Sequence, residues 1–423
     1  MKNIFLKILK LILKQLARAV ISRYQPGIVA ITGSVGKTST KEAIRAVLSK
    51  ERKIRATSGN FNNEIGVPLT ILGDWQKIEK PAFLFWLKVL IVSLFRILIP
   101  RKFSSFKYPE ILVLEYAADQ PGNIKYLLEI AQPQIAVITA IGEIPVHVES
   151  YSGPEALARE KAKLVEQLPT VGFAILNADD PFVIEMKNRT RSQVMTFGFS
   201  DAAQMKIAGF ENLSNGEPTG IVFKLEYGGS FVPIKINGAF GKGQAYAAVA
   251  AACVGLIFGL NLVKIAEALA TNFQPPSRRM NLVPGVKGTF IIDDSYNASP
   301  LSMKVSLETL RDLKAKRKIA VLGDMLEIGK YSLEAHEKVG KFVASFVDLL
   351  ITVGPRAKFI AEAANKAGLA KENISSFLIA EEAKKEVEFK IKKGDLILIK
   401  GSRAIGLDKV VDEIKEISRG PIV

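Results

Sequence analysis

Cysteine, histidine and tryptophan are scarce in this sequence. Its 423 residues include one cysteine, two histidines and two tryptophans. A single cysteine excludes a disulfide framework, and Cys253 lies in an alanine-rich helical run where it would pack as a small apolar side chain. Internal repeats and low-complexity stretches are also missing from the sequence. With 48% hydrophobic and 24% charged residues, the composition is that of a globular protein long enough for two or three domains.

Long uninterrupted hydrophobic runs are missing too. Lysines break the first apolar stretch at every turn of a helix, so this stretch predicts neither a cleavable signal peptide nor a membrane-spanning helix. We therefore expect a cytoplasmic protein.

Acidic residues are absent from the two segments that hold most of the positive charge. The formal net charge is +16, and residues 1–26 carry six basic side chains while residues 80–108 carry six more. The same two segments are the most apolar of the chain. Nucleic-acid-binding patches are rarely so apolar, whereas a membrane surface favours both properties at once. We expect no nucleic-acid partner, and peripheral association with the inner face of the cell membrane.

The spacing in residues 1–26 predicts a basic amphipathic helix. Basic side chains recur three and four positions apart on one face, and apolar side chains cover the other. The basic set is Lys7, Lys10, Lys14 and Arg18, and the apolar set is Ile4, Phe5, Ile8, Leu9, Ile12, Leu16 and Val20. Such a helix suits the headgroup layer of a membrane. The alternative is a helix docked on the body of the protein or on a second subunit.

Residues 83–99 form a second apolar segment. Seventeen residues with Lys88 and Arg96 two helical turns apart on one face suit an interfacial helix or a re-entrant hairpin better than a span. Trp86 fits an interfacial anchor. We expect membrane contact here, and a protein–protein contact is the alternative.

The strongest functional signal is the stretch from Ile28 to Ser39. An apolar, β-branched run ends in a glycine-bracketed turn, and a Lys-Thr pair then opens a helix that we expect to run to about Lys50. In such a turn the backbone N–H groups and the positive helix end face nucleotide phosphates, Lys37 reaches the β/γ oxygens and Thr38 binds Mg²⁺. The predicted nucleotide-binding residues are Gly33, Ser34, Val35, Gly36, Lys37, Thr38 and Ser39. The alternative is a plain strand-to-helix turn with an exposed lysine.

Polar side chains follow other apolar segments. Glu115 ends the predicted strand Ile111–Leu114, at the sheet edge where α/β proteins place their ligands, although a helix-capping acid is the alternative. The loop Thr57–Pro68 is dense in Asn and Gly, which suits ligand contact through residues such as Asn60, or is ordinary turn chemistry. His147 lies in the loop after the predicted strand at 135–139.

Thr32–Ser39 followed by Gly59–Pro68 is similar to the Mur ligase superfamily. Further matches are Asp293–Pro300, Leu322–Glu327 with His336 after it, and Lys400–Arg403. The resemblance covers about residues 27–415, and the combination is far more specific than any one motif. It is greatest to the branch of the family that adds D-alanyl-D-alanine to UDP-N-acetylmuramoyl-tripeptide in peptidoglycan synthesis.

The resemblance implies an ATP site with two magnesium ions. Thr38, Glu115 and His147 match magnesium ligands of the family, and Lys161 matches a helix lysine that is carbamylated and bridges both ions. A carbamate would turn this lysine into the oxygen ligand that a hard cation needs. Further nucleotide contacts are implied for Arg279, near the phosphates, and for Asp294 and Asn297, and we expect Asn60 to contact the nucleotide as well. Gln244 departs from the family, which usually has asparagine there, and its amide is expected to hydrogen-bond adenine instead.

The implied reaction forms an amide bond through an acyl phosphate. A carboxylate attacks the γ-phosphate of ATP, and an amine then attacks the acyl phosphate and releases phosphate. Such catalysis depends on positioning and charge neutralisation, and closure of the C-terminal domain would exclude water. The expected catalytic residues are Lys37, Glu115, His147 and Lys161. The expected partners are a muramoyl-peptide-like acid and D-alanyl-D-alanine or a similar amine.

We expect this chain to bind its acid substrate in a different way from the members of that branch. Only some 26 residues precede the phosphate loop, where the branch carries a domain that grips the UDP-sugar. The acid would then be held differently, or would be a lipid-linked precursor. Two alternatives stay open: a Mur-like ligase for another acid and amine, such as a poly-amino-acid or a folate-like acid, and a non-catalytic nucleotide-binding scaffold at the membrane.

The expected fold is α/β. After the helix at 1–26 we expect a central P-loop-type ATPase domain at 27–275 with a mostly parallel sheet and an apolar, basic insertion at about 80–108. Residues 276–423 alternate between strand and helix, which predicts a Rossmann-like, doubly wound domain. The strands expected there are 289–293, 318–323, 349–353, 376–379 and 395–400. Residues 193–237 predict a small antiparallel patch of short strands.

Overall fold

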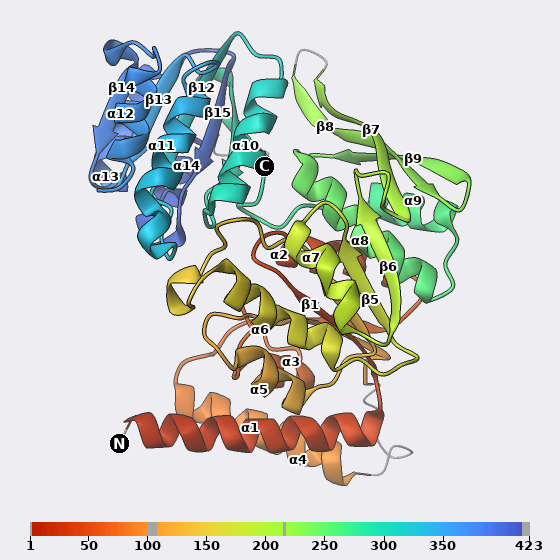
Figure 1. Ribbon diagram of the computed structural model, residues 1–423. Helices are drawn as coiled ribbons and strands as arrows, with labels where there is room; N and C mark the ends of the chain where they lie inside the picture. Colours follow the sequence, from red (N-terminus) through yellow and green to blue (C-terminus); the bar gives the residue numbers. More distant parts are fainter. Residues whose placement is uncertain (1, 100–107, 215–216, 417–423) are drawn as a thin grey trace, which may run out of the picture.

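Two β-sheets organise the part of the chain that the computed structural model describes, residues 2–99, 108–214 and 217–416 (Figure 1). The first has nine strands in the order β2-β3-β1-β4-β5-β6-β7-β8-β9. They are β1 (Gly27–Thr32), β2 (Ile54–Ala56), β3 (Ile111–Glu115), β4 (Ile135–Ile138), β5 (Phe173–Asn177), β6 (Gln193–Gly198), β7 (Met205–Ser214), β8 (Pro218–Tyr227) and β9 (Ser230–Asn237). Pairing is parallel from β2 to β7 and antiparallel from β7 to β9.

Helices cover both faces of this sheet. Along β1, Val29 and Ile31 join the core on one face while Ile28 and Ala30 join the core on the other, so four consecutive apolar positions are buried. The first face carries α2 (Lys37–Leu48), α8 (Lys242–Ile257) and α9 (Leu262–Asn272). The second carries α3 (Gly66–Leu72), α5 (Asn123–Ile130), α6 (Pro154–Glu166) and α7 (Pro181–Ile184).

The second sheet has six strands in the order β10-β11-β15-β12-β13-β14, all parallel except β10. They are β10 (Asn281–Gly285), β11 (Thr289–Asp294), β12 (Arg317–Gly323), β13 (Leu349–Val353), β14 (Ile374–Phe377) and β15 (Asp395–Lys400). One face carries α10 (Pro300–Asp312), α11 (Ser332–Val343) and α12 (Lys358–Lys366), and the other carries α13 (Ala380–Lys390) and α14 (Asp408–Ile414). Short 3₁₀ turns are η2 (Val148–Ser150), η3 (Glu185–Arg189), η4 (Val286–Gly288), η5 (Gly329–Tyr331), η6 (Lys371–Asn373) and η7 (Arg403–Ile405).

The expected α/β class with a mostly parallel sheet and a second, doubly wound sheet is confirmed. Two local predictions are wrong, the second only in part. The strand expected at 376–379 is β14, which starts two residues earlier, because Leu378 and Ile379 are exposed residues that lead into α13. The antiparallel patch expected at 193–237 is confirmed for β7–β9 but wrong for β6, which pairs in parallel with β5 and β7; β7–β9 extend the same sheet and bury Ile207 and Phe223 in its core.

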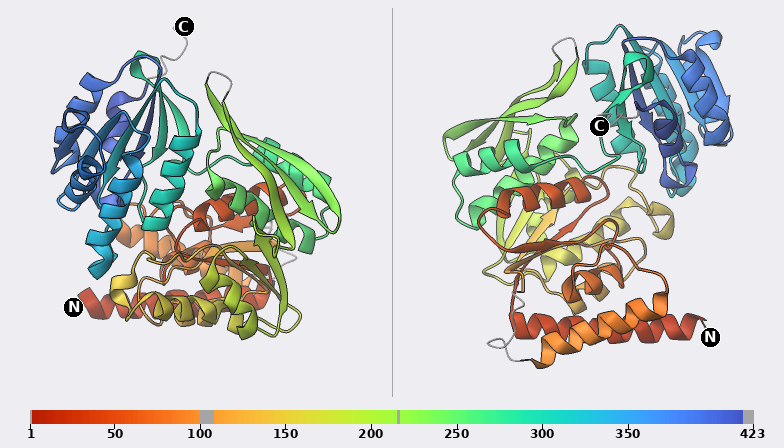
Figure 2. Two further views of the ribbon diagram at one scale, coloured as in Figure 1. Left: turned by 45° about the horizontal axis from the view of Figure 1, so that its top comes forward. Right: turned by 180° about the vertical axis from the view of Figure 1, so that it is seen from behind.

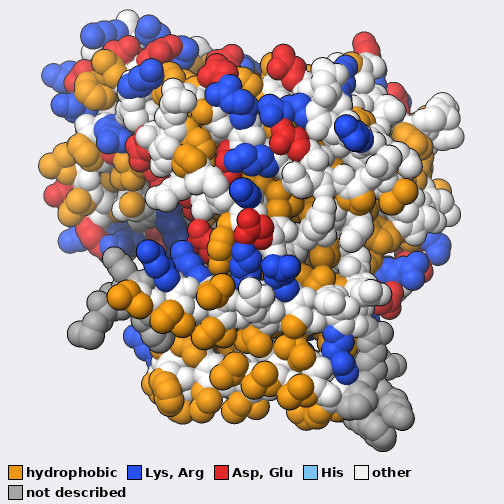
Figure 3. Space-filling view, turned by 60° about the horizontal axis from the view of Figure 1, so that its bottom comes forward, with side chains coloured by type: hydrophobic (Ala, Val, Ile, Leu, Met, Phe, Trp, Pro, Cys, Tyr) orange, Lys and Arg blue, Asp and Glu red, His pale blue; other side chains and the backbone are white. Residues whose placement is uncertain are grey.

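α1 (Lys2–Tyr24) and α4 (Ala82–Leu98) lie side by side beneath the first sheet (Figures 1 and 2). They run in the same direction, and at their carboxyl ends the Tyr24 hydroxyl donates a hydrogen bond to the Arg96 carbonyl (3.1 Å). α1 is docked on the body through Leu13, Ala17 and Val20, which are buried. Seen from below, hydrophobic side chains gather over these two helices (Figure 3).

The basic face expected on α1 is directed partly inward. Lys10 lies 3.4 Å from the Glu64 carboxylate and Lys14 lies 2.5 Å from Glu129 on α5. The spacing of the lysines predicts the helix face on which they lie, but it does not predict their acidic partners, which come from other elements of the fold. The alternative of a helix docked on the body therefore holds for this side of α1, while Ile8 and other apolar side chains of α1 remain exposed.

Residues 82–98 form one continuous helix, so a re-entrant hairpin is wrong for this segment. The expectation that Lys88 and Arg96 share a face is also wrong, because Arg96 is buried and donates to the Leu72 carbonyl, whereas Lys88 is exposed. Within the described ranges, no helix is both long and apolar enough to cross a membrane.

Candidate active site

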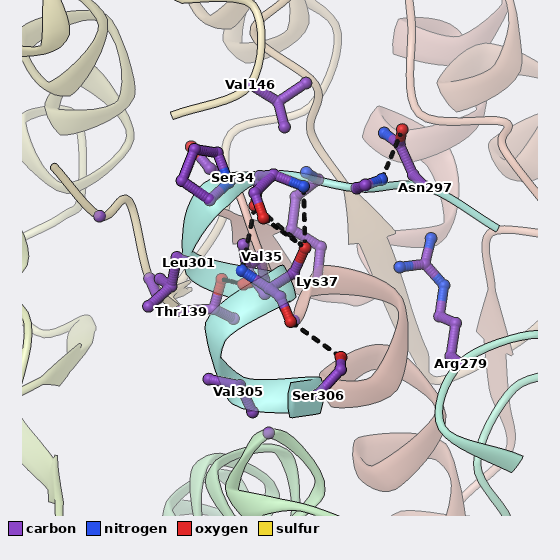
Figure 4. Close-up of a pocket in the computed structure, with 18 of the residues that line it drawn as sticks. Ser34, Val35, Lys37, Thr139, Val146, Arg279, Asn297, Leu301, Val305 and Ser306 are labelled. Atoms are coloured by element: carbon purple, nitrogen blue, oxygen red, sulfur yellow. Dashed lines mark hydrogen bonds between the residues drawn. The ribbon is translucent and has the colours of Figure 1, made fainter. Parts of the chain in front are cut away.

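A cleft of about 1490 Å³ lies between the two sheets and their helices. The phosphate loop between β1 and α2 forms its floor, and the start of α10 faces this loop from the second sheet. Figure 4 shows Ser34 and Lys37 of the loop together with Arg279, Asn297 and Leu301 from the other side of the cleft. The two halves touch near Gly142, where an added Cβ would lie 3.1 Å from the Leu301 side chain.

The phosphate loop is held by the neighbouring strand end. The N–H groups of Ser34 and Val35 both donate to the Ala140 carbonyl (2.6 and 3.2 Å), and the Thr139 hydroxyl donates to the Val35 carbonyl (2.6 Å). Gly36 has φ of 91° at the start of α2, a conformation that favours glycine. The buried Ser34 hydroxyl has no hydrogen-bond partner among the described residues, which suits a loop that receives an oxygen-rich ligand.

Thr38 and Glu115 meet at the carboxyl ends of adjacent strands. The Thr38 hydroxyl donates to Glu115 Oε2 (3.2 Å), and the Asn62 amide donates to Glu115 Oε1 (3.0 Å). Glu115 is almost fully buried, so both carboxylate oxygens depend on these partners. The pair presents the hard oxygen donors that Mg²⁺ takes in proteins.

Two lysines converge on a single backbone carbonyl. Lys37 Nζ and Lys161 Nζ each donate to the Gly33 oxygen at 2.9 Å. Burial lowers the pKa of both amines, and the charge of Lys37 lowers the pKa of Lys161 further. α6 thus delivers Lys161 into the phosphate loop, whereas the sequence pattern alone resembles that of a solvated helix charge.

His147 lies in the cleft between two carboxylates, one from each half of the molecule. We call the half built on the first sheet the first lobe and the half built on the second sheet the second lobe. Its Nε2 is 3.2 Å from Asp119, and its Nδ1 is 3.3 Å from Glu327. Burial lowers the pKa of His147 to about 4; the Asp119 carboxylate opposes this shift, and the charges of Lys37 and Lys161 add to it. The carboxylates occupy opposite nitrogens of the ring and therefore do not converge on one point.

Arg279, Tyr296 and Arg403 line the wall of the cleft opposite the phosphate loop. The Arg279 guanidinium stacks over the Tyr296 ring (4.2 Å from its centroid), and Arg403 approaches the same ring (5.6 Å). Gln244, buried at the start of α8, donates its amide N–H to the Arg279 carbonyl (3.0 Å), while its Oε1 is buried with no partner in the part of the chain that the structure describes. An unpaired acceptor in a cleft is available to a ligand N–H.

Asp294 and Asn297 line the cleft, but both make internal contacts. The Asp294 carboxylate accepts from the Lys400 ammonium (2.5 Å) and the Ser306 hydroxyl (2.6 Å), all buried. The Asn297 side-chain oxygen accepts from the Ala298 N–H (2.9 Å). Asp294 in this arrangement fixes β11, α10 and β15 to one another.

The second histidine belongs to the framework. His336 is fully buried on α11; its Nε2 accepts from the Met325 N–H (3.0 Å) and its Nδ1 contacts the Ser332 carbonyl (2.6 Å). The Ser402 hydroxyl accepts from the Leu326 N–H (2.8 Å). These contacts hold the loop in which Glu327 lies beside His147. The motifs Leu322–Glu327 and Lys400–Ser402 therefore both position this loop.

Many residues of the cleft were not predicted as site residues, and four of them make contacts described above: Asn62, Asp119, Tyr296 and Glu327. Asn60, which was predicted, lines the cleft but is exposed, and Asn62 makes the contact with Glu115. All four lie within or next to quoted motifs, which is the only sequence signal for them. Within the described ranges, no group of three or more His, Cys, Asp or Glu side chains could hold a metal ion.

The fold and the cleft define a two-lobed enzyme that uses a nucleoside triphosphate. Two family descriptions match the chain: the Mur ligase middle domain over residues 31–80 and 95–255, and the Mur ligase glutamate ligase domain over residues 278–403. The chain belongs to the Mur ligase family, whose members are ATP-dependent, ADP-forming amide ligases. The match to the middle domain leaves out residues 81–94, which form most of α4.

Relatives and solved structures agree with this membership. UDP-N-acetylmuramoyl-tripeptide–D-alanyl-D-alanine ligase of Bacillus subtilis is 31% identical over 96% of this chain and 79% of its own length. The Escherichia coli enzyme of the same name is 26% identical over 98% and 82%. MurF from Acinetobacter baumannii superposes with a TM-score of 0.78 at 25% identity, covering 96% of this chain and 80% of its own. MurF ligase from Thermotoga maritima in complex with ADP gives 0.77 at 26% identity, covering 96% and 83%.

Proposed function

We propose that this ligase joins D-alanyl-D-alanine, or a closely similar amine, to the terminal carboxylate of a muramoyl-tripeptide in cell-wall synthesis. The names of the relatives support this choice of substrates. The observation that carries it is the convergence of Lys37, the Thr38–Glu115 pair and Lys161 on one phosphate loop. This arrangement suits phosphoryl transfer to a carboxylate and contains no side chain placed as a covalent nucleophile.

Each step of the reaction has a counterpart in the cleft. The substrate carboxylate attacks the γ-phosphorus of ATP, the bond to the ADP oxygen breaks, and an acyl phosphate forms. Lys37 and Arg279 neutralise charge on the phosphates. The amine then attacks the acyl carbon, loses a proton, and inorganic phosphate leaves. α10, facing the loop from the second lobe, limits access of water to the acyl phosphate.

Two magnesium ions are part of the proposal. The Thr38 hydroxyl and Glu115 carboxylate fit one ion beside the nucleotide, since they are adjacent oxygen donors. His147 as a neutral imidazole, and Lys161 after carbamylation, would hold the second. The ions would supply charge neutralisation on the phosphates. Lys161 as an unmodified amine does not fit a metal, because it donates to Gly33 and repels cations.

Adenine is proposed to bind beside Gln244. Its buried, unpaired Oε1 would accept from the exocyclic amine of the base. Asn60, Asp294 and Asn297 line the same cleft, and we assign Asp294 an indirect role because Lys400 and Ser306 occupy its carboxylate. Asn297 and Asn60 remain candidates for direct contact.

The proposed place of action is the inner face of the cell membrane, and the central and C-terminal domains are proposed to divide near residue 275. The separation of the two sheets between α9 and β10 supports this division. The apolar side chains left exposed on α1 and α4 support the location.

Substrate-dependent phosphate release tests the function. Purified full-length enzyme with ATP, Mg²⁺, UDP-N-acetylmuramoyl-tripeptide and D-alanyl-D-alanine should release phosphate and yield the pentapeptide, identified by mass spectrometry. Lys37→Ala should lower turnover about 10²–10³-fold, as expected for loss of one electrostatic contact to the reacting phosphate. Turnover with a poly-amino-acid or folate-like acid instead would overturn the choice of substrate, and no turnover with any acid would overturn the function.

A further inference from the structure

Exposed apolar side chains are concentrated on two helices. Of the 21 large hydrophobic side chains that are exposed in the described ranges, thirteen belong to α1 or α4. Ile4, Ile8 and Leu11 of α1 and Phe83, Ile91 and Leu98 of α4 are each 52–75% exposed. These six define what we call the α1–α4 face, the hydrophobic area in the lower part of Figure 3. A contiguous apolar surface of this kind marks an interaction site.

The α1–α4 face is held in place by its inner side. Phe85, Val89 and Ser93 of α4 are buried against the body, and the Arg96 side chain bonds to the Leu72 carbonyl. The exposed residues of α4 recur every three or four positions along its opposite side. The face is therefore presented by helices that are packed against the body of the protein.

The two helices of the face carry charge of one sign only. Lys7 and Arg18 on α1 and Lys88 on α4 are exposed, and neither helix contains an acidic residue. Neighbouring elements supply some acidic partners, since Lys88 lies 3.9 Å from Glu79 of the preceding loop and Lys14 pairs with Glu129 of α5. A surface that combines aliphatic side chains with an excess of basic over acidic groups is complementary to lipid headgroups of negative charge over an acyl layer.

We propose that the α1–α4 face adsorbs in the plane of an anionic lipid bilayer, with the exposed apolar residues of both helices entering the interface and Lys7, Arg18 and Lys88 contacting lipid phosphates. A second copy of the chain fits less well, because it would set two acid-free, basic faces against each other. The proposal supplies the lipid class and the contacts for the proposed location, and it does not depend on which substrates the cleft takes.

Co-sedimentation with vesicles tests the proposal on the full-length enzyme. Binding to phosphatidylglycerol–phosphatidylcholine vesicles should be strong, and binding to pure phosphatidylcholine should be at least about tenfold weaker, given the electrostatic attraction of several basic groups. Phe83→Glu with Ile91→Glu should lower binding to the anionic vesicles at least about tenfold. Phe389→Glu is the matched control, since Phe389 is 81% exposed on α13, and it should bind as the unchanged enzyme does.

A charge variant and an assembly measurement complete the test. Lys88→Glu should weaken binding more at low than at high salt, because screening removes the electrostatic part of the binding free energy.

ATP turnover of each variant shows whether the cleft is intact, so that loss of vesicle binding with retained turnover supports the proposal and leaves the function untouched. Equal sedimentation of the double variant and the unchanged enzyme would overturn it. So would a dimer in light scattering that the double variant abolishes, which would assign the face to a second copy.

Discussion

Lys37 and Lys161 share the Gly33 carbonyl, each with its Nζ at 2.9 Å from that oxygen. Two ammonium groups so close together repel each other, and burial adds the cost of desolvating both. The pKa of Lys161 accordingly lies well below its usual value. A lowered pKa increases the uncharged fraction of the amine, and only the uncharged amine has a lone pair that can attack carbon dioxide.

Carbamylation of Lys161 is the first prediction. Enzyme in buffer with ¹³C-bicarbonate should give a carbamate carbon signal by NMR, and Lys161→Met should lack it. Removal of carbon dioxide should lower turnover reversibly, with recovery on addition of bicarbonate. A signal that persists in Lys161→Met would assign the modification to another lysine.

The stability of the protein without carbon dioxide should rise with pH because of Lys161. Its pKa in the folded state lies below the ordinary lysine value of the unfolded chain, so the unfolded chain binds more protons between the two values and the free energy of unfolding increases with pH there. Lys161→Met should remove this slope and stabilise the protein at pH 7, as measured by urea unfolding at several pH values. Lys163→Met, on the same helix and 39% exposed at the side chain, is the control and should keep the slope.

Gly33 is predicted to tolerate no side chain. It has φ of 149°, and an added Cβ would lie 2.0 Å from the Thr139 hydroxyl and 3.1 Å from the Ala140 carbonyl. Gly33→Ala should cost about 1–3 kcal/mol in the free energy of unfolding through strain, and should weaken ATP binding in calorimetry at least tenfold. Gly228→Ala is the matched control: φ is 58° with nothing within 4 Å, so it should cost about 1 kcal/mol and leave ATP binding unchanged.

The buried pair of Lys400 and Asp294 should be sensitive to loss of one partner. Lys400→Met leaves the Asp294 carboxylate without its cation, and should destabilise the protein by about 3–5 kcal/mol in chemical unfolding. The double variant with Asp294→Asn should recover much of this loss, because no unpaired buried charge remains. Additive losses in the double-mutant cycle would show that the pair is not coupled.

Gln244 should discriminate between purine bases. Gln244→Leu removes the unpaired acceptor, and should raise the KM for ATP about fivefold, as for loss of one hydrogen bond of about 1 kcal/mol. Inosine triphosphate lacks the exocyclic amine, so its KM should change less. An equal change for both nucleotides would mean that Gln244 acts only through its contact with the Arg279 carbonyl.

Local sequence patterns predicted much of the fold and part of the candidate active site. The apolar run and glycine turn before Lys37 predict both a buried strand and its loop, and Glu115 was predicted because a buried strand ends there. What could not be predicted depends on partners far along the chain. Lys10 meets Glu64 only after α1 docks, and Glu327 reaches His147 across the cleft from the other sheet. Arg96 is buried for the same reason, since periodicity predicts a face but not what covers it.

The two sheets lie on opposite sides of the cleft, with α1 and α4 at the far side of the first (Figure 1). A chain that rests on a bilayer through these helices would keep its second lobe pointing into the aqueous phase. That lobe could then rotate about the connection between α9 and β10 while α1 and α4 stay bound to the bilayer. Successive turnovers would proceed without release from the lipid, so that product is released close to the membrane surface each time.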